Sequence, residues 1–189
     1  MRGLLRGEEI TERGLITVEQ AKLYSRPKQL PLFAGAAISE QSARWVGGWA
    51  DALLTVSRPP DELRRVVQAF HEGGGAGKPM FLKVQLSWAE SDDDARRGAR
   101  EQWAGNVLPS SVLSELRHPR QFADAGRCVS ADELDRNVRI SSDLQRHAEW
   151  LAQDIELGFS RLYLHNVNRD QERFIDAFAE RVLPQLRSR

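Results

Sequence analysis

The sequence has little of what secreted and membrane proteins depend on. It contains one cysteine, Cys128, so no disulfide can form within the chain and no oxidising compartment is required. No apolar run approaches the ~20 residues that a membrane-spanning helix needs. The first residues, MRGLLRGEEITERG, carry early acids and no apolar centre, unlike a secretory signal. We therefore expect a cytoplasmic protein that does not bind membranes.

The sequence also has no excess of either charge. It contains 27 Lys and Arg residues and 27 Asp and Glu residues, for a formal net charge of +0. Because neither sign dominates the long-range field, a nucleic-acid partner is not expected. The four histidines lie far apart and show no zinc-ligand spacing, so no metal site is predicted.

What the sequence does contain is a repeated order of apolar runs and amphipathic segments. Its 189 residues, 41% of them hydrophobic, are enough for one domain with a buried core. Consecutive apolar residues are typical of a strand that is buried on both faces. We predict four such strands: LFAGAAI (32–38), ALLTV (52–56), PMFLKVQLSW (79–88, with some alternation) and FSRLYLHNV (159–167).

Helices are predicted between and after these strands. Ser39 and Ser91 are suited to N-cap two of them, and Pro60 fits the first turn of a third. The predicted helical segments are 40–50, 57–75, 90–105, 141–158 and 168–186. The second has Leu63, Val66, Val67 and Phe70 on one face, and the fourth is opened by a Ser142/Gln145 capping box. In the last, a break is expected at Pro184, and the inward residues are Phe174, Ala177, Phe178 and Val182. Residues 106–140 are less regular, with short helices and a Ser130/Glu133 capping box.

Strands that are separated by helices must pair in parallel, which gives an α/β fold. The pattern alone does not choose between a doubly wound open sheet and part of a (β/α) barrel. We expect one domain over 1–189, consisting of a connecting segment (1–30), three βα units (31–105), a helical insertion (106–140) and a last helix–strand–helix unit (141–189).

Candidate site residues follow the strands, where parallel α/β folds bind ligands. Ser39 either holds an anion at a helix start or only caps that helix. Thr55, Ser57 and Arg58 lie at the end of the second strand; Arg58 either neutralises a phosphate or is a solvated turn residue. Trp88, at the end of the third strand, either walls a ring-shaped ligand or packs in the core. His165 and Asn166 end the fourth strand; a lone histidine is as readily a structural group as a functional one.

The stretch EGGGAGKP has the look of a phosphate-binding loop but fails in detail. Glu72 stands at the position of the first glycine, and Pro79 stands where Ser or Thr would bind magnesium. The stretch also precedes a strand rather than following one. We interpret it as a glycine C-cap and a helix-to-strand connection.

Three segments resemble a known family. PLFAGAAISEQSARWVGGWADALLTV, GGGAGKPMFLKVQLSW and SSDLQRHAEWLAQDIELGFSRLYLHNVNRDQERFIDAFAERVLPQL are together similar to the C-terminal half of luciferase-like flavin-dependent oxidoreductases. The subgroup that they resemble most is the FMN-dependent one similar to deazaflavin-dependent dehydrogenases. The resemblance covers most of residues 7–189, and Ala52 departs from the glycine that many members carry.

The resemblance implies the C-terminal half of a (β/α)8 barrel, with the four strands as the fifth to eighth and 106–140 as the insertion before the last unit. It implies hydride transfer or monooxygenation with FMN, or alternatively with the deazaflavin coenzyme F-420, at the C-terminal mouth. By position, the residues implied at the phosphate end are Ala37, Ile38 and Ser39, with Thr55 and Ser57 close by. Those implied at the ring or substrate side are Trp88, His165 and Asn166. No catalytic residue is identified.

The first four strands of the family are absent from this sequence, so we expect a truncated form of the enzyme. The alternative hypothesis is a non-catalytic half-barrel that associates with itself, or with a separate N-terminal half, through an open sheet edge. A third hypothesis is a complete open-sheet protein that binds phosphate.

Overall fold

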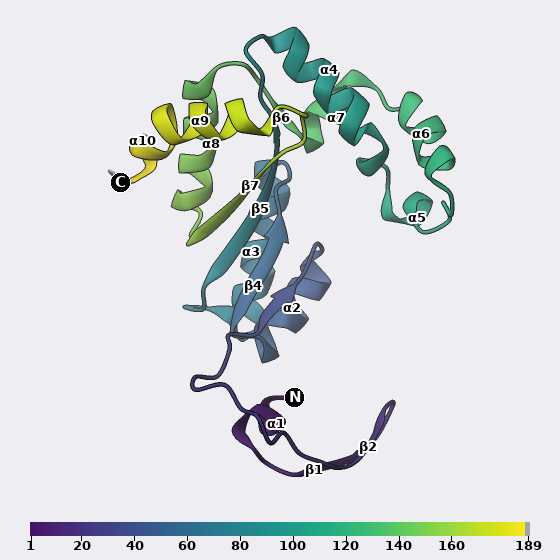
Figure 1. Cartoon of the computed structure of the whole chain (residues 1–189), viewed down its shortest axis with the longest axis vertical. Coiled ribbons are helices and arrows are strands. Elements are labelled where there is room, and N and C mark those ends of the chain that lie inside the picture. The colour runs from purple at the N-terminus through teal and green to yellow at the C-terminus, as the bar shows by residue number, and fades with distance from the viewer. Residues whose placement is uncertain (188–189) are drawn as a thin grey trace. The chain divides into compact units, whose positions relative to one another are not determined.

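The computed structural model of the chain describes residues 1–187 (Figure 1). The chain divides into two compact units, and the boundary falls between Phe33 and Ala34. The first unit contains α1 (Arg2–Arg6) and an antiparallel pair, β1 (Ile10–Arg13) and β2 (Thr17–Ala21). Both strands lie within the segment that the sequence analysis described only as connecting, residues 1–30.

The second unit alternates strands and helices in the predicted order. Its elements are β3 (Ala34–Ala36), α2 (Glu40–Trp49), β4 (Ala52–Val56), α3 (Pro60–Phe70), the π-helical turn η1 (His71–Gly75), β5 (Met80–Ser87), α4 (Asp92–Trp103), the 3-10 turn η2 (Ala104–Asn106), α5 (Ser110–Leu113), α6 (Pro119–Arg127), α7 (Ala131–Asn137), β6 (Arg139–Ile140), α8 (Leu144–Glu156), β7 (Arg161–Asn166), α9 (Gln171–Arg181) and α10 (Leu183–Arg187). The break between α9 and α10 falls at Val182, beside the predicted break at Pro184.

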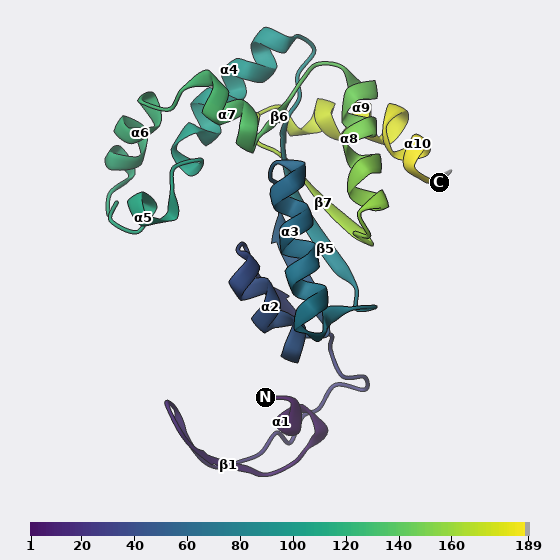
Figure 2. The same cartoon turned by 180° about the vertical axis from the view of Figure 1, so that it is seen from behind.

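The strands of this unit form one parallel sheet. β4 pairs with β3 and β5, and β7 pairs with the other edge of β5. Figure 2 shows α2 and α3 lying over the strands, whereas in Figure 1 the strands lie in front of these helices. This arrangement confirms the predicted α/β class with a parallel sheet, and it has the form of a partial barrel.

The two-residue strand β6 was not predicted. Its neighbour Ser141 donates its backbone N–H to Ser87 O, and Ser57 donates to Lys83 O. On the opposite edge of β5, Val167 donates to Leu86 O. Because successive carbonyls of a strand point to opposite edges, β6 continues the β4 edge of β5 beyond the end of β4.

The two faces of the sheet differ in their side chains. Residues paired in register face the same side, so Leu53, Leu82 and Leu162 belong to the face that packs against the helices in the main core. The opposite face, called the inner face below, carries Leu54 and Phe81 together with the polar residues described in the next subsection. Other hydrophobic residues that fill the main core come from α3, α8 and α9.

The expectation that the first strand is buried on both faces is wrong. β3 is three residues long, and only its central Gly35 is buried. Ala34 and Ala36 are exposed, and their register with Ala52 and Leu54 puts them on the inner face. Leu32 and Ile38, at the two ends of the apolar run, are 51% and 52% exposed, so this run does not mark a buried strand.

Helix starts follow the predicted caps with one exception. The hydroxyls of Ser39, Ser91 and Ser130 each accept a backbone N–H three residues later. The predicted Ser142/Gln145 capping box is wrong, because Asp143 caps α8 and accepts from Gln145 N at 2.8 Å. Ser142 is drawn into other contacts: its N–H donates to Asp92 Oδ1 at 2.6 Å, and its carbonyl accepts from the Trp88 indole.

The glycines after α3 make a close backbone contact with α2, which supports their interpretation as a connection. A Cβ on Gly73 would lie 1.9 Å from Arg44 O, and one on Gly47 would lie 2.4 Å from Phe70 O. Gly74 has a positive φ of 97°, which glycine adopts without strain. Lys78 Nζ donates to Gly47 O at 2.6 Å, so it is used in packing against the end of α2.

His147 of α8 makes folding stability depend on pH. It is 1% exposed, and burial lowers its pKa to about 4. The unfolded chain therefore binds one more proton than the folded chain between pH 6.5 and about 4. The free energy of unfolding is expected to fall by about 3 kcal/mol as the pH falls through this window, relative to its value above pH 6.5.

Urea titrations of the wild type and His147→Gln across this window measure that contribution. The glutamine variant retains an N–H donor for Ser141 O, which lies 3.0 Å from His147 Nε2. Across this window, the free energy of unfolding of the variant is expected to fall less than that of the wild type. The difference between the two falls should equal the contribution assigned to His147, about 3 kcal/mol. Parallel pH curves for the two proteins would contradict the assignment.

Candidate functional site

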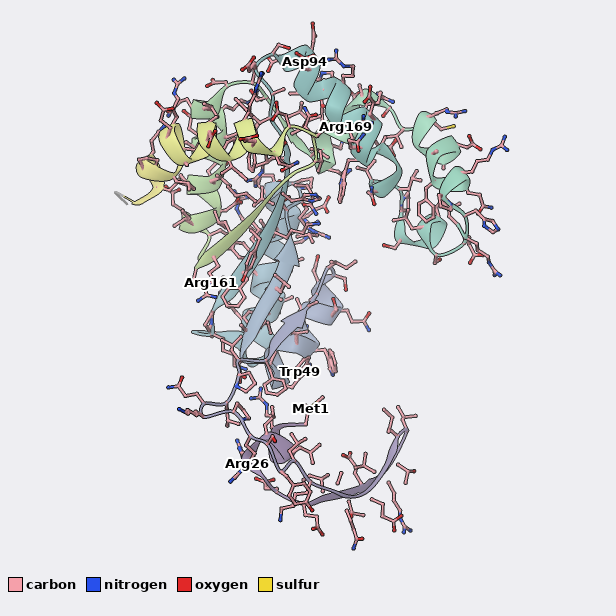
Figure 3. All side chains as sticks on the ribbon, viewed as in Figure 1. Met1, Arg26, Trp49, Asp94, Arg161 and Arg169 are labelled. Atoms are coloured by element: carbon pink, nitrogen blue, oxygen red, sulfur yellow. The ribbon has the colours of Figure 1, made fainter. Side chains whose placement is uncertain are left out.

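The parallel strands bring their carboxyl ends to one rim of the sheet. In Figure 3, Arg161 marks the amino end of β7, and Arg169 lies beyond its carboxyl end, near Asp94 at the start of α4. Parallel α/β folds bind ligands at this rim because helix starts and loops converge there. The predicted site residues at the ends of β3, β4, β5 and β7 therefore lie along one edge of the sheet.

Ser57 and His165 are two predicted residues that flank β5 from opposite edges near this rim. Ser57 Oγ donates to Gln85 Oε1 at 2.7 Å and accepts from Gln85 N at 3.1 Å. Gln85 pairs in register with His165 on β7. The end of β4, the middle of β5 and the end of β7 are thus linked through Gln85, a residue that the sequence analysis did not single out.

A cation and two rings lie beside this link. Lys83, two residues before Gln85 and hence on the same face, places its Nζ 5.1 Å from the centroid of the Trp103 ring. The Trp103 ring meets the His165 ring edge-on, with centroids 4.9 Å apart. Trp103 is the last residue of α4, so this helix brings an indole to the inner face of the sheet. We call Lys83, Trp103 and His165 the inner-face cluster.

The surroundings of His165 in the inner-face cluster favour its neutral form by lowering its pKa. Burial lowers the pKa of His165, and the positive charge of Lys83 lowers it further. His165 Nδ1 is buried and has no hydrogen-bond partner in the structure. A neutral imidazole with an unused nitrogen is available to a ligand either as a donor or as an acceptor.

The residues predicted at the phosphate end have different environments. Ser39 is exposed and forms a reciprocal capping box with Ser42, in which Ser42 N donates to Ser39 Oγ at 3.2 Å. Ile38 is 52% exposed, whereas Ala37 is buried in the main core. Ser39 therefore has the capping role that the sequence left open, and its exposure also leaves it accessible at the rim.

Three further predicted residues are buried. The Trp88 indole packs edge-on against Phe178 and donates to Ser142 O at 3.1 Å, which is the core role that the sequence left open. Asn166 accepts from Trp88 N at 3.0 Å through Oδ1, while its Nδ2 has no partner. Thr55 is 1% exposed, and its Oγ1 also lacks a partner. The structure thus separates these residues from the inner-face cluster.

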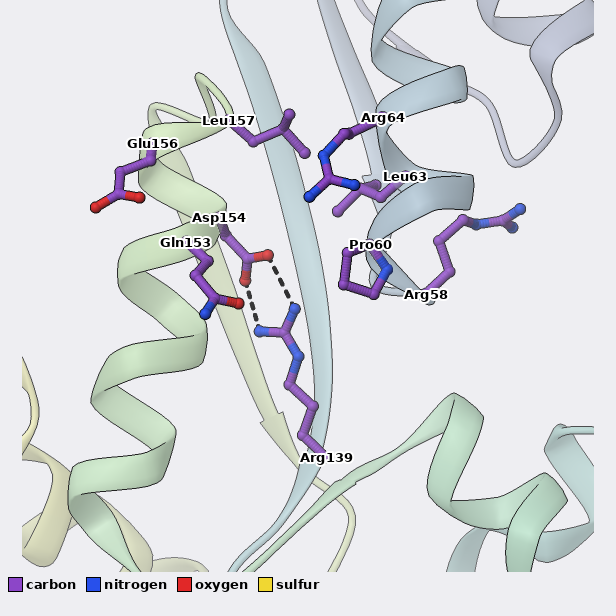
Figure 4. A pocket seen from close by; sticks show the side chains of 9 residues that line it. All are labelled: Arg58, Pro60, Leu63, Arg64, Arg139, Gln153, Asp154, Glu156 and Leu157. Atoms are coloured by element: carbon purple, nitrogen blue, oxygen red, sulfur yellow. Dashed lines mark hydrogen bonds and ion pairs between the residues drawn. The ribbon is translucent and has the colours of Figure 1, made fainter.

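A cavity of about 250 Å³ lies between the start of α3 and the end of α8. Arg139 lines it and forms a bidentate pair with Asp154, with N···O distances of 2.6 and 2.9 Å. Figure 4 shows this pair among the lining residues. Arg58 lines the same cavity; its side chain is 23% exposed, and its ion pair with Glu62 is long at 3.6 Å. Arg58 is therefore a wall of this cavity rather than a fully solvated turn residue.

Two kinds of feature are absent from residues 1–187. None of the helices in this range is both long and apolar enough to span a membrane. Within the same range, no group of three or more His, Cys, Asp or Glu side chains is arranged to hold a metal ion.

Comparison with known proteins decides the family. The profile of the luciferase-like monooxygenase family matches residues 1–161. The chain belongs to this family. The luciferase-like assignment agrees with the parallel sheet.

Curated relatives of this luciferase-like chain include two F420-dependent glucose-6-phosphate dehydrogenases. The protein of Microbacterium testaceum (strain StLB037) is 28% identical over 193 residues, which cover 97% of this chain and 57% of the relative. The protein of Kribbella flavida is 28% identical over 180 residues, covering 88% and 52%. The chain spans about half the length of the curated relatives it matches.

Solved structures show the same fold. An F420-dependent secondary alcohol dehydrogenase in complex with an F420–acetone adduct superposes with a TM-score of 0.87 at 24% identity, over 98% of this chain and 58% of the other. The oxygenating constituent of 3,6-diketocamphane monooxygenase from Pseudomonas putida, in complex with FMN, superposes with a TM-score of 0.61 at 14% identity. The match covers 98% of this chain and 60% of the other. The luciferase-like fold is therefore shared with proteins of both cofactor types.

Proposed function

We propose that this chain provides the C-terminal rim of an oxidoreductase site that binds a deazaflavin or flavin and transfers hydride. The observation that carries the proposal is the inner-face cluster beside the Ser57–Gln85 link, toward the carboxyl ends of strands where parallel α/β folds bind ligands. F420 is the preferred cofactor, because the curated relatives named above are F420-dependent; FMN is the alternative.

The residues present suit a planar, polar ligand. Ala34 and Ala36 project only methyl groups from the inner face of β3, which leaves space there. His165 Nδ1 has no partner, and the neighbouring Lys83 is half-buried. A surface with room and with unsatisfied donors is what an aromatic heterocycle bearing carbonyl groups requires.

The roles proposed for the individual residues follow from these contacts. A bound flavin or deazaflavin supplies the hydride chemistry. Trp103 excludes water from one side of the cluster, Lys83 provides positive charge, and His165 holds or donates a proton at Nδ1. Ser57 holds Gln85 in one orientation through two hydrogen bonds. Ser39, with the start of α2, is proposed to contact the phosphate of the cofactor tail.

A half-barrel that works by association is the second candidate. β3 pairs only with β4, and β7 pairs only with β5, so each has one edge without a strand partner among residues 34–187. Such edges favour pairing with another chain. In this case the ligand site is completed by a second copy or by a separate N-terminal half.

One experiment on the purified chain separates the two candidates. F420 and FMN are titrated by fluorescence while light scattering gives the mass. Saturable binding by a monomer supports the rim site as it stands, and binding by a dimer supports completion of the site by a second copy. Failure to bind either cofactor at any mass would contradict the oxidoreductase proposal for this chain.

Ser39→Ala tests the phosphate end. It is expected to weaken F420 binding by about 1 kcal/mol, or roughly fivefold, which is the value of one hydrogen bond. Binding of the deazaflavin riboside that lacks the phosphate is expected to be unchanged. Equal losses for both ligands would assign Ser39 to helix capping alone.

A further inference from the structure

Lys83 carries a charge that the described part of the protein does not balance. It lies in the middle of β5 and is half-buried. None of the ion pairs found among the described residues includes it, and its recorded contact is with the face of Trp103. The other buried cation of the sheet region, Arg139, has a bidentate carboxylate partner. A cation removed from water without a carboxylate partner is costly unless another anion approaches it.

His165 offers a second unsatisfied group beside the same point. Its ring meets the Trp103 ring, and the Lys83 Nζ lies over that same indole, so both groups contact one side chain on the inner face. Its buried Nδ1 has no partner. The neutral imidazole donates one N–H, and with Nδ1 as the donor it adds to the positive field of Lys83.

We propose that the inner-face cluster is an oxyanion site, in which Lys83 Nζ and His165 Nδ1–H bind one negatively charged oxygen of a phosphate or carboxylate ligand. Trp103 forms the wall and strengthens the interaction by excluding water. This inference rests on the proposed function for its biological role and specifies the chemical class of ligand that the rim accepts. The oxyanion belongs either to the cofactor or to a second small molecule.

Arg161 provides a matched control for charge. It lies on the same face of β7 as His165, four residues nearer the amino end, and its guanidinium sits over the Phe81 ring at 5.4 Å. Arg161→Met and Lys83→Met each remove one positive charge from the inner face. Only the second removes a charge from the cluster.

The test uses the full chain and two probes. First, inorganic phosphate and acetate are titrated at fixed ionic strength, and the imidazole resonances of His165, assigned with His165→Asn, are followed by NMR. Second, the affinity for F420 is measured by fluorescence. Circular dichroism at each step shows that the variants are folded.

We expect saturable shifts of the His165 resonances with at least one small anion. Lys83→Met is expected to bind that anion at least tenfold more weakly than wild type, and Arg161→Met less than twofold more weakly. If the cofactor supplies the oxyanion, F420 affinity falls at least tenfold in Lys83→Met as well; if a second molecule supplies it, F420 affinity is unchanged.

Two results would overturn the proposed oxyanion site. One is unshifted His165 resonances together with unchanged F420 affinity, and the other is an equal loss of ligand affinity in Lys83→Met and Arg161→Met. The small-anion titration requires no cofactor, so a chain that binds phosphate at His165 but neither F420 nor FMN would refute the proposed function and leave the oxyanion site standing.

Discussion

Replacing Asp154 with alanine is expected to lower the free energy of unfolding by roughly 3–5 kcal/mol. The Asp154 side chain is 4% exposed, and both of its oxygens accept hydrogen bonds from the Arg139 guanidinium, which is 18% exposed (Figure 4). The substitution leaves this guanidinium without its anion in a largely dry position. Equilibrium denaturation in urea at pH 7 measures the loss.

Two further variants show whether the loss comes from the unpaired charge. The double substitution Arg139→Met with Asp154→Leu removes both charges and is expected to recover most of the stability, because apolar pairs often replace buried ion pairs without cost. Gln153→Ala changes the adjacent exposed residue and is expected to stay within about 0.5 kcal/mol of wild type. A double variant as unstable as Asp154→Ala would refute the explanation.

Gly47→Ala is expected to lower the free energy of unfolding by about 2–3 kcal/mol, because an added methyl group would collide with backbone rather than with a movable side chain. The new Cβ would lie 2.4 Å from Phe70 O and 2.9 Å from Gly73 C. Relief of this clash requires α2 to move away from the end of α3 and from η1. Thermal or urea denaturation of the variant gives the loss.

The next residue of the same helix is the matched control. A Cβ on Gly48 would lie 3.6 Å from Gly73 O, an ordinary van der Waals distance. Alanine is also the better helix former by roughly 0.5–1 kcal/mol. Gly48→Ala is therefore expected to be neutral or stabilising, and equal losses at both positions would show that the close approach of α2 and η1 is not the cause.

Much of the main sheet could be predicted from the sequence because its signals are local. The apolar runs that became β4, β5 and β7 lie between capped helices, so parallel pairing was the available arrangement. The π-helical turn η1 lies within the segment that the sequence assigned to a connection. The strand β6 escaped prediction because two residues carry no periodicity; it exists through pairing with Leu86 and Ser87, which are far from it in sequence.

The candidate site was predicted less completely, because Lys83 and Gln85 lie inside a strand rather than at its end. Lys83 and Gln85 lie inside PMFLKVQLSW, and their spacing of two within an apolar strand signals a face that is not purely core. That signal was present and was not used. No signal in the sequence pointed to Trp103, because its indole reaches the sheet only through the path of α4. The Ser142 cap failed for a similar reason, since the hydrogen bond from Ser142 N to Asp92 depends on tertiary structure.

Trp103 belongs to two regions at once. It packs against a satellite cluster that contains Ala104, Val129 and Leu134, and it also forms the wall of the inner-face cluster. Substitutions within the helical insertion are therefore expected to tilt the indole and, at the ligand site proposed above, to change ligand preference while the strands stay as they are. With this arrangement, ligand selectivity can change during evolution without changes in the sheet. Closely related sequences that differ mainly across 104–140 are therefore the first in which to look for a changed ligand preference.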